Sequence, residues 1–304
     1  MKHRFYITVL FLLPAAWANA QETGLSFLRI GVNAMASAMG DAQVAATRDA
    51  FATYWNPAGL AASANALGIS HRIWVGDVKA YDIAARLPAS RGGAWGLALT
   101  ATDSGDLEAR EVPGDPAGLF GAQFISIGAS YAHSLRALRG GITAKFLRES
   151  IYNTSASGYA FDVGLQVDIY RELVTIGAAL RNAGRMSELE AERTRLPRTL
   201  QAGLAVFPFQ VIAGADGTRL LQLMVTAEVA HLFASKLTRL HSGLSATVME
   251  LVDLRGGYVT RDELRDFTFG LGLHFDTMLV DYAYIPFEEG FEGPGHVLSV
   301  SYVW

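Results

Sequence analysis

A regular alternation of apolar and other side chains runs along most of this chain and restricts its fold more than any other feature. In residues 158–170, GYAFDVGLQVDIY, every second side chain is large and apolar, whereas Asp162 and Asp168 lie between them. Successive side chains of a strand point to opposite faces, so a period of two predicts a β-strand with one apolar and one polar face. The two acidic residues indicate that the polar face is hydrated.

Similar alternating segments follow one another from residue 65 to the end of the chain. An even number of strands, each of roughly ten residues with alternating side chains and with glycines on the polar face, is typical of transmembrane β-barrels. The sequence therefore predicts an all-β fold, a transmembrane antiparallel barrel of about fourteen strands; a large soluble β-sandwich or barrel is the alternative. The strands are expected near 65–75, 78–88, 92–103, 121–133, 138–149, 156–169, 173–182, 197–207, 220–230, 236–248, 251–260, 265–276, 277–285 and 295–304.

The N-terminus predicts export. A basic MKHR is followed by the apolar FYITVLFLLPAAW and by the small-residue site Ala18-Asn19-Ala20, so residues 1–20 are expected to be a cleaved signal peptide, with an uncleaved anchor as the alternative. The chain is 51% hydrophobic and 18% charged, yet no later stretch approaches the ~18 apolar residues that a spanning helix needs. Because only helices and closed barrels satisfy the backbone in lipid, a barrel in the bacterial outer membrane is expected.

Charge and chemistry exclude several classes of function. The net charge of −4 gives no basic surface for nucleic acid, and the absence of cysteine excludes disulfides and thiolate metal sites. No G-x-S-x-G, H-E-x-x-H or phosphate-loop motif is present, and the histidines lack metal-ligand spacing. We therefore expect no catalytic residue, no cofactor and no metal, and a protein that is not an enzyme; a barrel protease or lipase is the least favoured alternative.

The connections between the segments are expected to differ at the two ends of the barrel. Short turns should lie at the periplasmic end, and longer connections, at 103–121, 183–196 and 287–295, at the outer end. The connection 208–219 is long on the short side, which a miscounted strand would explain.

Charged residues of both signs lie on the polar faces and are expected to point into the barrel. We interpret them as an ion-paired lining that holds an internal segment; a polar conduit or a barrel-embedded hydrolase is the alternative. They are Lys145, Asp162, Asp168, Arg181, Glu228, Arg239, Asp253, Arg255, His274 and Asp281.

Residues 21–63 do not alternate and are rich in alanine. A fourteen-stranded barrel has a lumen too wide for its wall side chains to fill, so this segment is predicted to be a small helical or irregular plug, with the barrel formed by 64–304. Within YWNPAGL, Tyr54 and Trp55 are expected to anchor the plug. Because the residue before proline avoids the helical region, Asn56, Pro57, Ala58, Gly59 and Leu60 are expected to turn the chain into the wall. A periplasmic turn below the barrel is the alternative.

The chain closes on GHVLSVSYVW, an alternating segment that ends in an aromatic residue. This ending, with Tyr302 and Trp304 on its apolar face, resembles the C-terminal signal that barrel-assembly machinery reads in outer-membrane proteins. An ordinary final strand is the alternative.

Two regions carry a family resemblance. GVNAMASAMGDAQVAATRDAFATYWNPAGLA is similar to the N-terminal signature of the PorV/PorQ family of outer-membrane proteins, which are relatives of the FadL channels. LRGGYV, FGLGLHF, VDYAYIPF and the closing segment are similar to the same family. Asp41, where a second small residue commonly follows Met-Gly, and the acidic FEEGFEG depart from the pattern.

The resemblance implies a fourteen-stranded, FadL-like barrel that binds secreted proteins and hands them over at the cell surface, in or beside a type IX secretion system. Its implied partners are outer-membrane lipid, secreted cargo proteins and a secretion translocon, with no nucleic acid. The alternative is a FadL-like channel for long-chain fatty acids or other hydrophobic small molecules. A channel should have an apolar lumen pocket, a movable plug and a kinked strand that opens the wall, whereas a shuttle should have a closed plug.

Overall fold

The computed structural model describes residues 24–62, 64–105, 107–109, 118–170, 173–189, 192–212, 219–288, 290 and 293–304. The predicted signal peptide, about half of the predicted connection 103–121 and part of 287–295 lie outside these residues. No helix in the described chain is long and apolar enough to cross a membrane.

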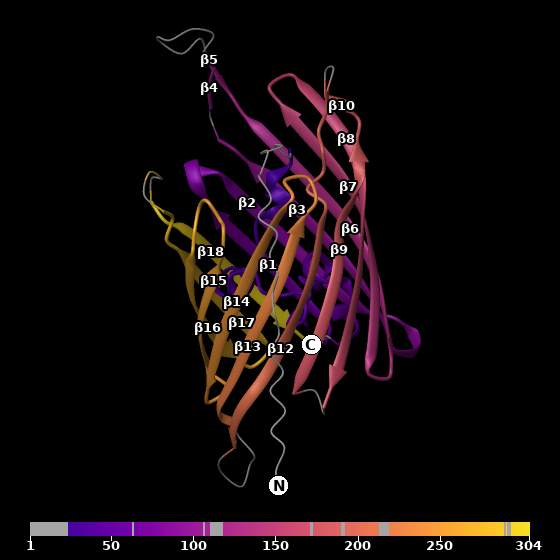
Figure 1. The fold of residues 1–304 in the computed structure, drawn as a ribbon, viewed down its shortest axis with the longest axis vertical. Coiled ribbons are helices and arrows are strands. Elements are labelled where there is room, and N and C mark those ends of the chain that lie inside the picture. The colour runs from indigo at the N-terminus through magenta and orange to yellow at the C-terminus, as the bar shows by residue number, and fades with distance from the viewer. Residues whose placement is uncertain are drawn as a thin grey trace, which may run out of the picture.

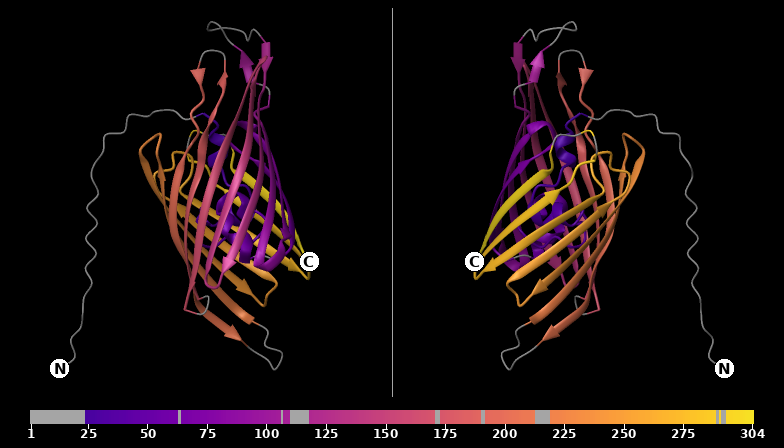
Figure 2. Two further views of the ribbon diagram at one scale, coloured as in Figure 1. Left: turned by 90° about the vertical axis from the view of Figure 1, so that its right-hand side faces the viewer. Right: turned by 90° about the vertical axis from the view of Figure 1, so that its left-hand side faces the viewer.

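Fourteen strands of the described chain close into one antiparallel barrel (Figures 1 and 2). Each strand pairs with the next, and β1 pairs with β18 to close the ring, with Leu67 opposite Tyr302. The predicted fold and strand number are confirmed. The strands are β1 (Ala66–Ile73), β2 (Lys79–Pro88), β3 (Gly93–Asp103), β6 (Ala122–Leu135), β7 (Leu138–Ile151), β8 (Thr154–Ile169), β9 (Val174–Met186), β12 (Thr199–Ile212), β13 (Arg219–Leu232), β14 (Leu237–Val248), β15 (Val252–Val259), β16 (Phe267–Phe275), β17 (Met278–Ile285) and β18 (Gly295–Val303).

The alternation in the sequence separates the two faces of this wall. On β8, Phe161 and Leu165 are 52% and 50% exposed on the outer face, while Asp162 and Gln166 are fully buried on the inner face. Large apolar side chains remain exposed on the other barrel strands in the same way. A belt of this size has no partner in water, and it matches the apolar outer band of a transmembrane barrel.

The barrel has a turn end and a loop end, which we define by their connections. The turn end carries the C-terminus and the connections at 89–92, 136–137, 249–251 and 276–277, and the loop end carries 74–78, 187–198, 233–236 and 260–266. Two small hairpins rise from the loop end, β4 (Leu107–Ala109) with β5 (Gly118–Phe120), and β10 (Glu188–Leu189) with β11 (Glu192–Arg193). The predicted asymmetry has two exceptions among the connections named here, because at the loop end only two residues, 152–153, join β7 to β8, and four, 233–236, join β13 to β14.

The predicted strand end at residue 207 was wrong. β12 continues to Ile212 past an irregularity between Val206 and Phe209, and it pairs with β13 from Arg219. The ladder between β12 and β9 ends at Val206, so the β12–β13 ribbon extends beyond its neighbours at the turn end (Figure 2). The strand count was therefore correct, and the long connection 208–219 consists in good part of strand.

The N-terminal segment, residues 24–62, lies inside the barrel, where Figure 2 shows it in indigo. It folds as η1 (Ser26–Arg29), α1 (Ala34–Ala38), α2 (Ala52–Trp55) and η2 (Pro57–Ala62), and most of its residues are buried. α1 contacts β15 to β18, whereas η2 contacts β3, β6, β7 and β8. Two further short helices, η3 (Val75–Asp77) and η4 (Ser90–Gly92), lie in connections of the wall.

Glycines of the inner face allow this segment to approach the wall closely. A Cβ added to Gly257 would lie 2.0 Å from the Gly40 nitrogen, and one added to Gly177 would lie 2.2 Å from the Val44 carbonyl oxygen. Separations below about 3 Å are shorter than van der Waals contact. The glycines that alternate with apolar residues are thus the points where the backbone of the segment meets the wall.

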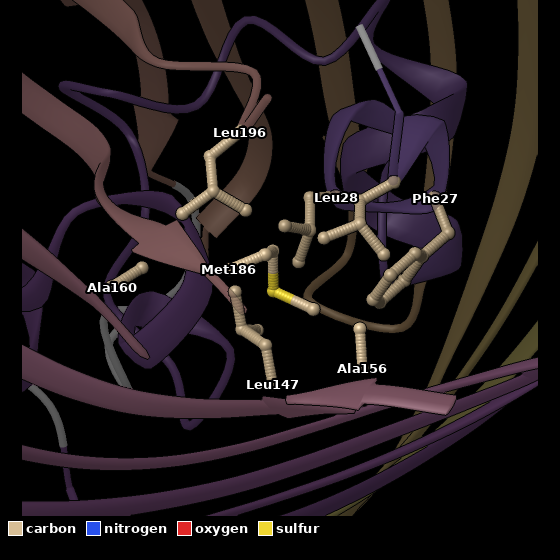
Figure 3. Close-up of a cluster of buried hydrophobic side chains, with 8 residues drawn as sticks. Phe27, Leu28, Leu147, Ala156, Ala160, Met186 and Leu196 are labelled. Atoms are coloured by element: carbon tan, nitrogen blue, oxygen red, sulfur yellow. The ribbon is translucent and has the colours of Figure 1, made fainter. Parts of the chain in front are cut away.

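A buried apolar cluster fixes the start of the segment to the loop end (Figure 3). Phe27 and Leu28 of η1 pack with Leu147 of β7, Met186 of β9 and Leu196, which precedes β12. The cluster thereby joins the N-terminal segment to three separate parts of the wall.

Candidate functional site

The inner face of the barrel is lined by ion pairs. Lys145 Nζ lies 2.5 Å from Asp162 Oδ2, and Arg255 pairs with both Asp253 and Asp281. The ten charged residues chosen from the sequence lie on inner faces or at the rim of the lumen, and eight of them are ion-paired as predicted. The other two, Arg181 and Glu228, are hydrogen-bonded. Further members of this network were not predicted from the sequence, namely Arg72, Asp82, Arg139, Asp41 and Arg265.

The missed pair Arg72–Asp82 had a usable signal. Arg72 Nε lies 3.1 Å from Asp82 Oδ2, and both side chains are 2% exposed. Arg72 is separated by two and four residues from Ser70 and Gly68 along β1, so the period of two already placed it on the inner face.

Ion pairs and hydrogen bonds attach the N-terminal segment to the wall. Arg48 lies 3.0 Å from Asp168, which also pairs with Arg139 of β7, and Asp41 pairs with Arg265. Burial and, second, the charge of Asp281 raise the pKa of Asp49 to about 6, which indicates a poorly hydrated surrounding.

Backbone groups of the segment are bound as well. The Val44 amide donates to Glu228 of β13 at 2.8 Å, and the Ala34 amide donates to the Ser299 hydroxyl of β18 at 2.8 Å. Gln166 of β8 donates to the Val44 carbonyl at 3.1 Å. The segment is therefore held from several sides of the lumen.

The YWNPAGL residues lie at the centre of this arrangement, and all seven are buried. Tyr54 donates its hydroxyl to the Leu28 carbonyl at 2.7 Å, and Trp55 donates to Asn33 at 3.0 Å. Asn56 donates to the carbonyls of Val44 at 2.7 Å and Leu165 of β8 at 3.1 Å. A turn exposed below the barrel does not fit these contacts.

Pro57, Ala58, Gly59 and Leu60 fold into η2 rather than directly into the wall, which begins at Ala66. The role of the motif as the plug-to-wall turn stays a prediction.

Tyr302 and Trp304 lie at the turn end beside the seam between β18 and β1. Their side chains are 45% and 53% exposed and stack with ring centroids 5.6 Å apart. The Trp304 amide donates to the Asn65 carbonyl at 3.0 Å. Their recognition by assembly machinery stays a prediction.

The wall is interrupted at the loop end of β9. The β9–β12 ladder runs from Val174 to Arg181 and ends there, opposite Thr199. Asn182 then adopts the left-handed backbone conformation, with φ 57°, and its amide donates to Asp162 at 2.7 Å. Beyond this point β9 continues beside β8 but no longer beside β12.

A cavity of about 880 Å³ fills this interruption, and we call it the wall gap. It is lined by Asn182, Ala183, Gly184, Arg185, Met186, Glu192, Arg193, Thr194, Arg195, Leu196, Arg198, Phe233 and Ala234. Two cavities between the N-terminal segment and the wall are far smaller, about 20 and 40 Å³. A third, of about 410 Å³, lies at the loop end between residues 26–30 of the segment and the connections 74–78 and 260–266. The largest of these four spaces is the one in the side of the barrel.

The family model described as "Type IX secretion system protein PorV" matches residues 15–160, a range that includes YWNPAGL and the first strands of the wall. This part of the chain, just under half of its length, is therefore similar to the PorV family. No protein with a curated description matches the sequence.

Solved structures resemble this barrel over nearly its whole length. The CymD monoaromatic hydrocarbon channel matches with a TM-score of 0.62 at 13% identity, covering 93% of this chain and 99% of that one. The Pseudomonas putida toluene transporter TodX matches with 0.63 at 11% (90% and 97% covered), and a Pseudomonas aeruginosa FadL homologue with 0.53 at 12% (89% and 97%). These likenesses show a shared fold, that of FadL-type outer-membrane barrels.

The barrel combines the feature expected of a shuttle with one of the three features expected of a channel. Its lumen is occupied by a closely packed internal segment, as expected of a shuttle. Its wall also contains a kinked strand and an opening, as expected of a channel. What the arrangement offers chemically is binding at the loop end and in the wall gap rather than passage through the centre.

Proposed function

We propose that this protein binds secreted proteins and hands them over at the cell surface, in or beside a type IX secretion system, without enzymatic activity. The observation that carries the proposal is the occupied lumen of a barrel similar in part to the PorV family. The N-terminal segment is seated on wall glycines and ion-paired to β8 and to the connection 260–266. Two of the spaces between it and the wall measure only about 20 and 40 Å³, and a larger one of about 410 Å³ lies at the loop end. Such a centre admits no polypeptide, so a protein partner has to engage an outer surface.

The loop end is the favoured surface for this engagement. It carries the β10–β11 hairpin, the wall gap and the connection 233–236, which together form a rim of polar, apolar and cationic side chains. The predicted contact loops 103–121 and 287–295 belong to the same end, with parts outside the described residues.

Deletion of the gene tests this proposal. In a strain that lacks the protein, secreted proteins with C-terminal signal domains are expected to accumulate in the periplasm instead of on the surface, as measured by fractionation and surface labelling. Complementation should restore export with the wild-type gene, and with a variant whose β12–β13 ribbon is shortened at the turn end. A variant with the β10–β11 hairpin shortened should restore it poorly. Normal surface attachment in the deletion strain would reject the proposal.

A second candidate is a channel for hydrophobic small molecules, favoured by the wall gap together with the fold shared with hydrocarbon channels. Transport through the lumen would require the N-terminal segment to move.

The chain has no cysteine, so Ala34→Cys with Ser299→Cys gives an unambiguous cross-link between segment and wall, where the Ala34 amide lies 2.8 Å from the Ser299 hydroxyl. Under the channel function, oxidation should stop uptake of a labelled long-chain fatty acid into proteoliposomes, and reduction should restore it; protein export should be insensitive to the cross-link.

A further inference from the structure

The rim of the wall gap is cationic, a feature that neither the closed lumen nor protein handover requires. Four arginines line the cavity, Arg185, Arg193, Arg195 and Arg198, against one acidic residue, Glu192. All four arginine residues are solvent-exposed.

Few carboxylates neutralise these arginines. Arg193 pairs with Glu188 at 3.0 Å across the β10–β11 hairpin. Within the described part of the chain, Arg185, Arg195 and Arg198 have no carboxylate partner at ion-pair distance. This contrasts with the lumen, where arginines such as Arg72, Arg139 and Arg255 are paired. Unpaired guanidinium groups are planar, multiply donating and suited to bidentate binding of phosphate oxygens.

The side chains behind the arginines are apolar. Met186 and Leu196 are buried in the cluster of Figure 3, and Phe233 is partly exposed beneath Arg198, whose guanidinium carbon lies 4.4 Å from the ring centroid. Arg185 lies 5.5 Å from the ring of Tyr159, an exposed residue of the outer face of β8. The cationic rim therefore adjoins both an apolar floor and the apolar belt.

A second cavity of about 350 Å³ lies on the β8 side of the same arginines. It is lined by Ser157, Gly158, Tyr159, Arg185, Met186, Ser187 and Arg193. Arg185, Met186 and Arg193 are common to both cavities. The guanidinium groups of Arg185 and Arg193 thus belong to a stretch of concave surface that passes from the wall gap to the lipid-facing side of β8.

We propose that this rim binds the phosphate headgroup of a membrane lipid, with an acyl chain against Tyr159 and Phe161 of β8 or the floor at Met186 and Phe233. A soluble anion would use the arginines but not the apolar floor, and an apolar molecule would use the floor but not the arginines. The pairing of the two, at one end of a membrane barrel, fits an amphipathic molecule with an anionic head. Basic pockets at membrane level bind lipid headgroups by the same chemistry. The proposal stands independently of protein handover.

Binding to the purified full-length mature protein in a neutral detergent tests the proposal. Dioctanoyl phosphatidic acid is the probe. Two comparison ligands each lack one part of it: dioctanoylglycerol has the acyl chains without the phosphate, and inorganic phosphate lacks the chains. Native mass spectrometry and competition with a fluorescent phosphatidic acid measure occupancy. We expect the phosphatidic acid to bind at least about tenfold more tightly than either comparison ligand, because charge-assisted and apolar contacts act together.

Variants locate the site. Arg195→Gln with Arg198→Gln should weaken phosphatidic acid binding by about tenfold, and Arg195→Lys with Arg198→Lys should retain part of it, because charge remains but the planar fork is lost. The matched control is Arg91→Gln with Arg136→Gln, two exposed arginines of the turn end, which should leave binding unchanged. Heat-dependent gel migration verifies that each barrel is closed.

Three results would overturn the proposal. Equal affinity for inorganic phosphate would indicate a site for soluble anions. Unchanged binding in the Arg195/Arg198 double glutamine variant would place the lipid elsewhere. Displacement of the lipid probe by an acidic peptide at lower concentration than by phosphatidic acid would assign the arginines to a protein partner.

Discussion

At the scale of single residues, buried polar groups decide how firmly the barrel holds together. Arg72 and Asp82 lie on neighbouring strands, and the Thr100 hydroxyl of β3 donates a second hydrogen bond to Asp82 at 2.8 Å. An ion pair removed from water is strongly destabilised when only one partner is taken away, because the other charge stays buried.

Asp82→Asn is therefore expected to lower the free energy of unfolding by about 3–5 kcal/mol. Denaturant unfolding in detergent, followed by tryptophan fluorescence, measures the change. The control is Glu250→Gln, which removes an exposed contact of 3.9 Å to Arg219 and should change stability by less than about 1 kcal/mol. Equal effects of the two variants would contradict a role for burial.

Gly177 offers a second test at this scale, because its missing side chain makes room for the backbone of Val44. Gly177→Ala should displace the N-terminal segment locally and cost about 1–3 kcal/mol as an overpacked contact. Limited proteolysis of the segment, read by N-terminal sequencing, should become faster. Gly118→Ala, at a position with nothing within 4 Å of an added Cβ, should match the wild type.

At the scale of elements, the interruption between β9 and β12 depends on Asn182. Its backbone is left-handed, its side chain accepts from Lys145 at 3.0 Å, and it donates to the Pro197 carbonyl at 3.3 Å. Left-handed backbone is tolerated by asparagine and glycine but strained in β-branched residues.

Asn182→Val should thus loosen the connection that borders the wall gap. Hydrogen exchange of residues 192–198 is expected to accelerate, with a loss of about 1–3 kcal/mol from strain and from the unmade hydrogen bonds. Asn182→Gly keeps the backbone conformation and should show a smaller effect. If both variants exchange like the wild type, the kink does not control this connection.

Much of the element pattern was predictable, because membrane and lumen impose opposite solvents on alternate residues. All fourteen strand ranges overlap the observed strands. The end of β12 was misjudged because Phe207-Pro208 resembles a turn, although proline is tolerated at an irregular edge. The charged lining followed from the same alternation.

The presence of aspartate at position 41, which departs from the family pattern, has a structural reason. Asp41 pairs with Arg265, which lies in a connection whose position the sequence does not reveal.

The wall gap was not predictable from residues 183–196. Its existence depends on one backbone angle at Asn182, on where the β9–β12 ladder ends, and on the packing of Leu196 with Met186 and Leu28. These are contacts between residues far apart in sequence, and local periodicity does not encode them. In the sequence, the arginines around the wall gap are typical of an ordinary polar loop.

At the scale of the whole molecule, the exposed apolar belt requires a lipid-like surrounding. Removal of detergent from the purified mature protein should convert a monodisperse species into aggregates, as measured by light scattering after size-exclusion chromatography. Transfer into nanodiscs should keep it monodisperse. A protein that remained monodisperse and β-structured in plain buffer would contradict the assignment of the outer face to hydrocarbon.

The seam between β1 and β18 sets an order of events during biogenesis. It joins the first strand of the wall to the last, and Trp304 completes it through Asn65. The ring therefore stays open until β18 pairs with β1, and the N-terminal segment has to be inside when it does. Sealing the wall and trapping its contents are consequently one step, set by the pairing of these two strands.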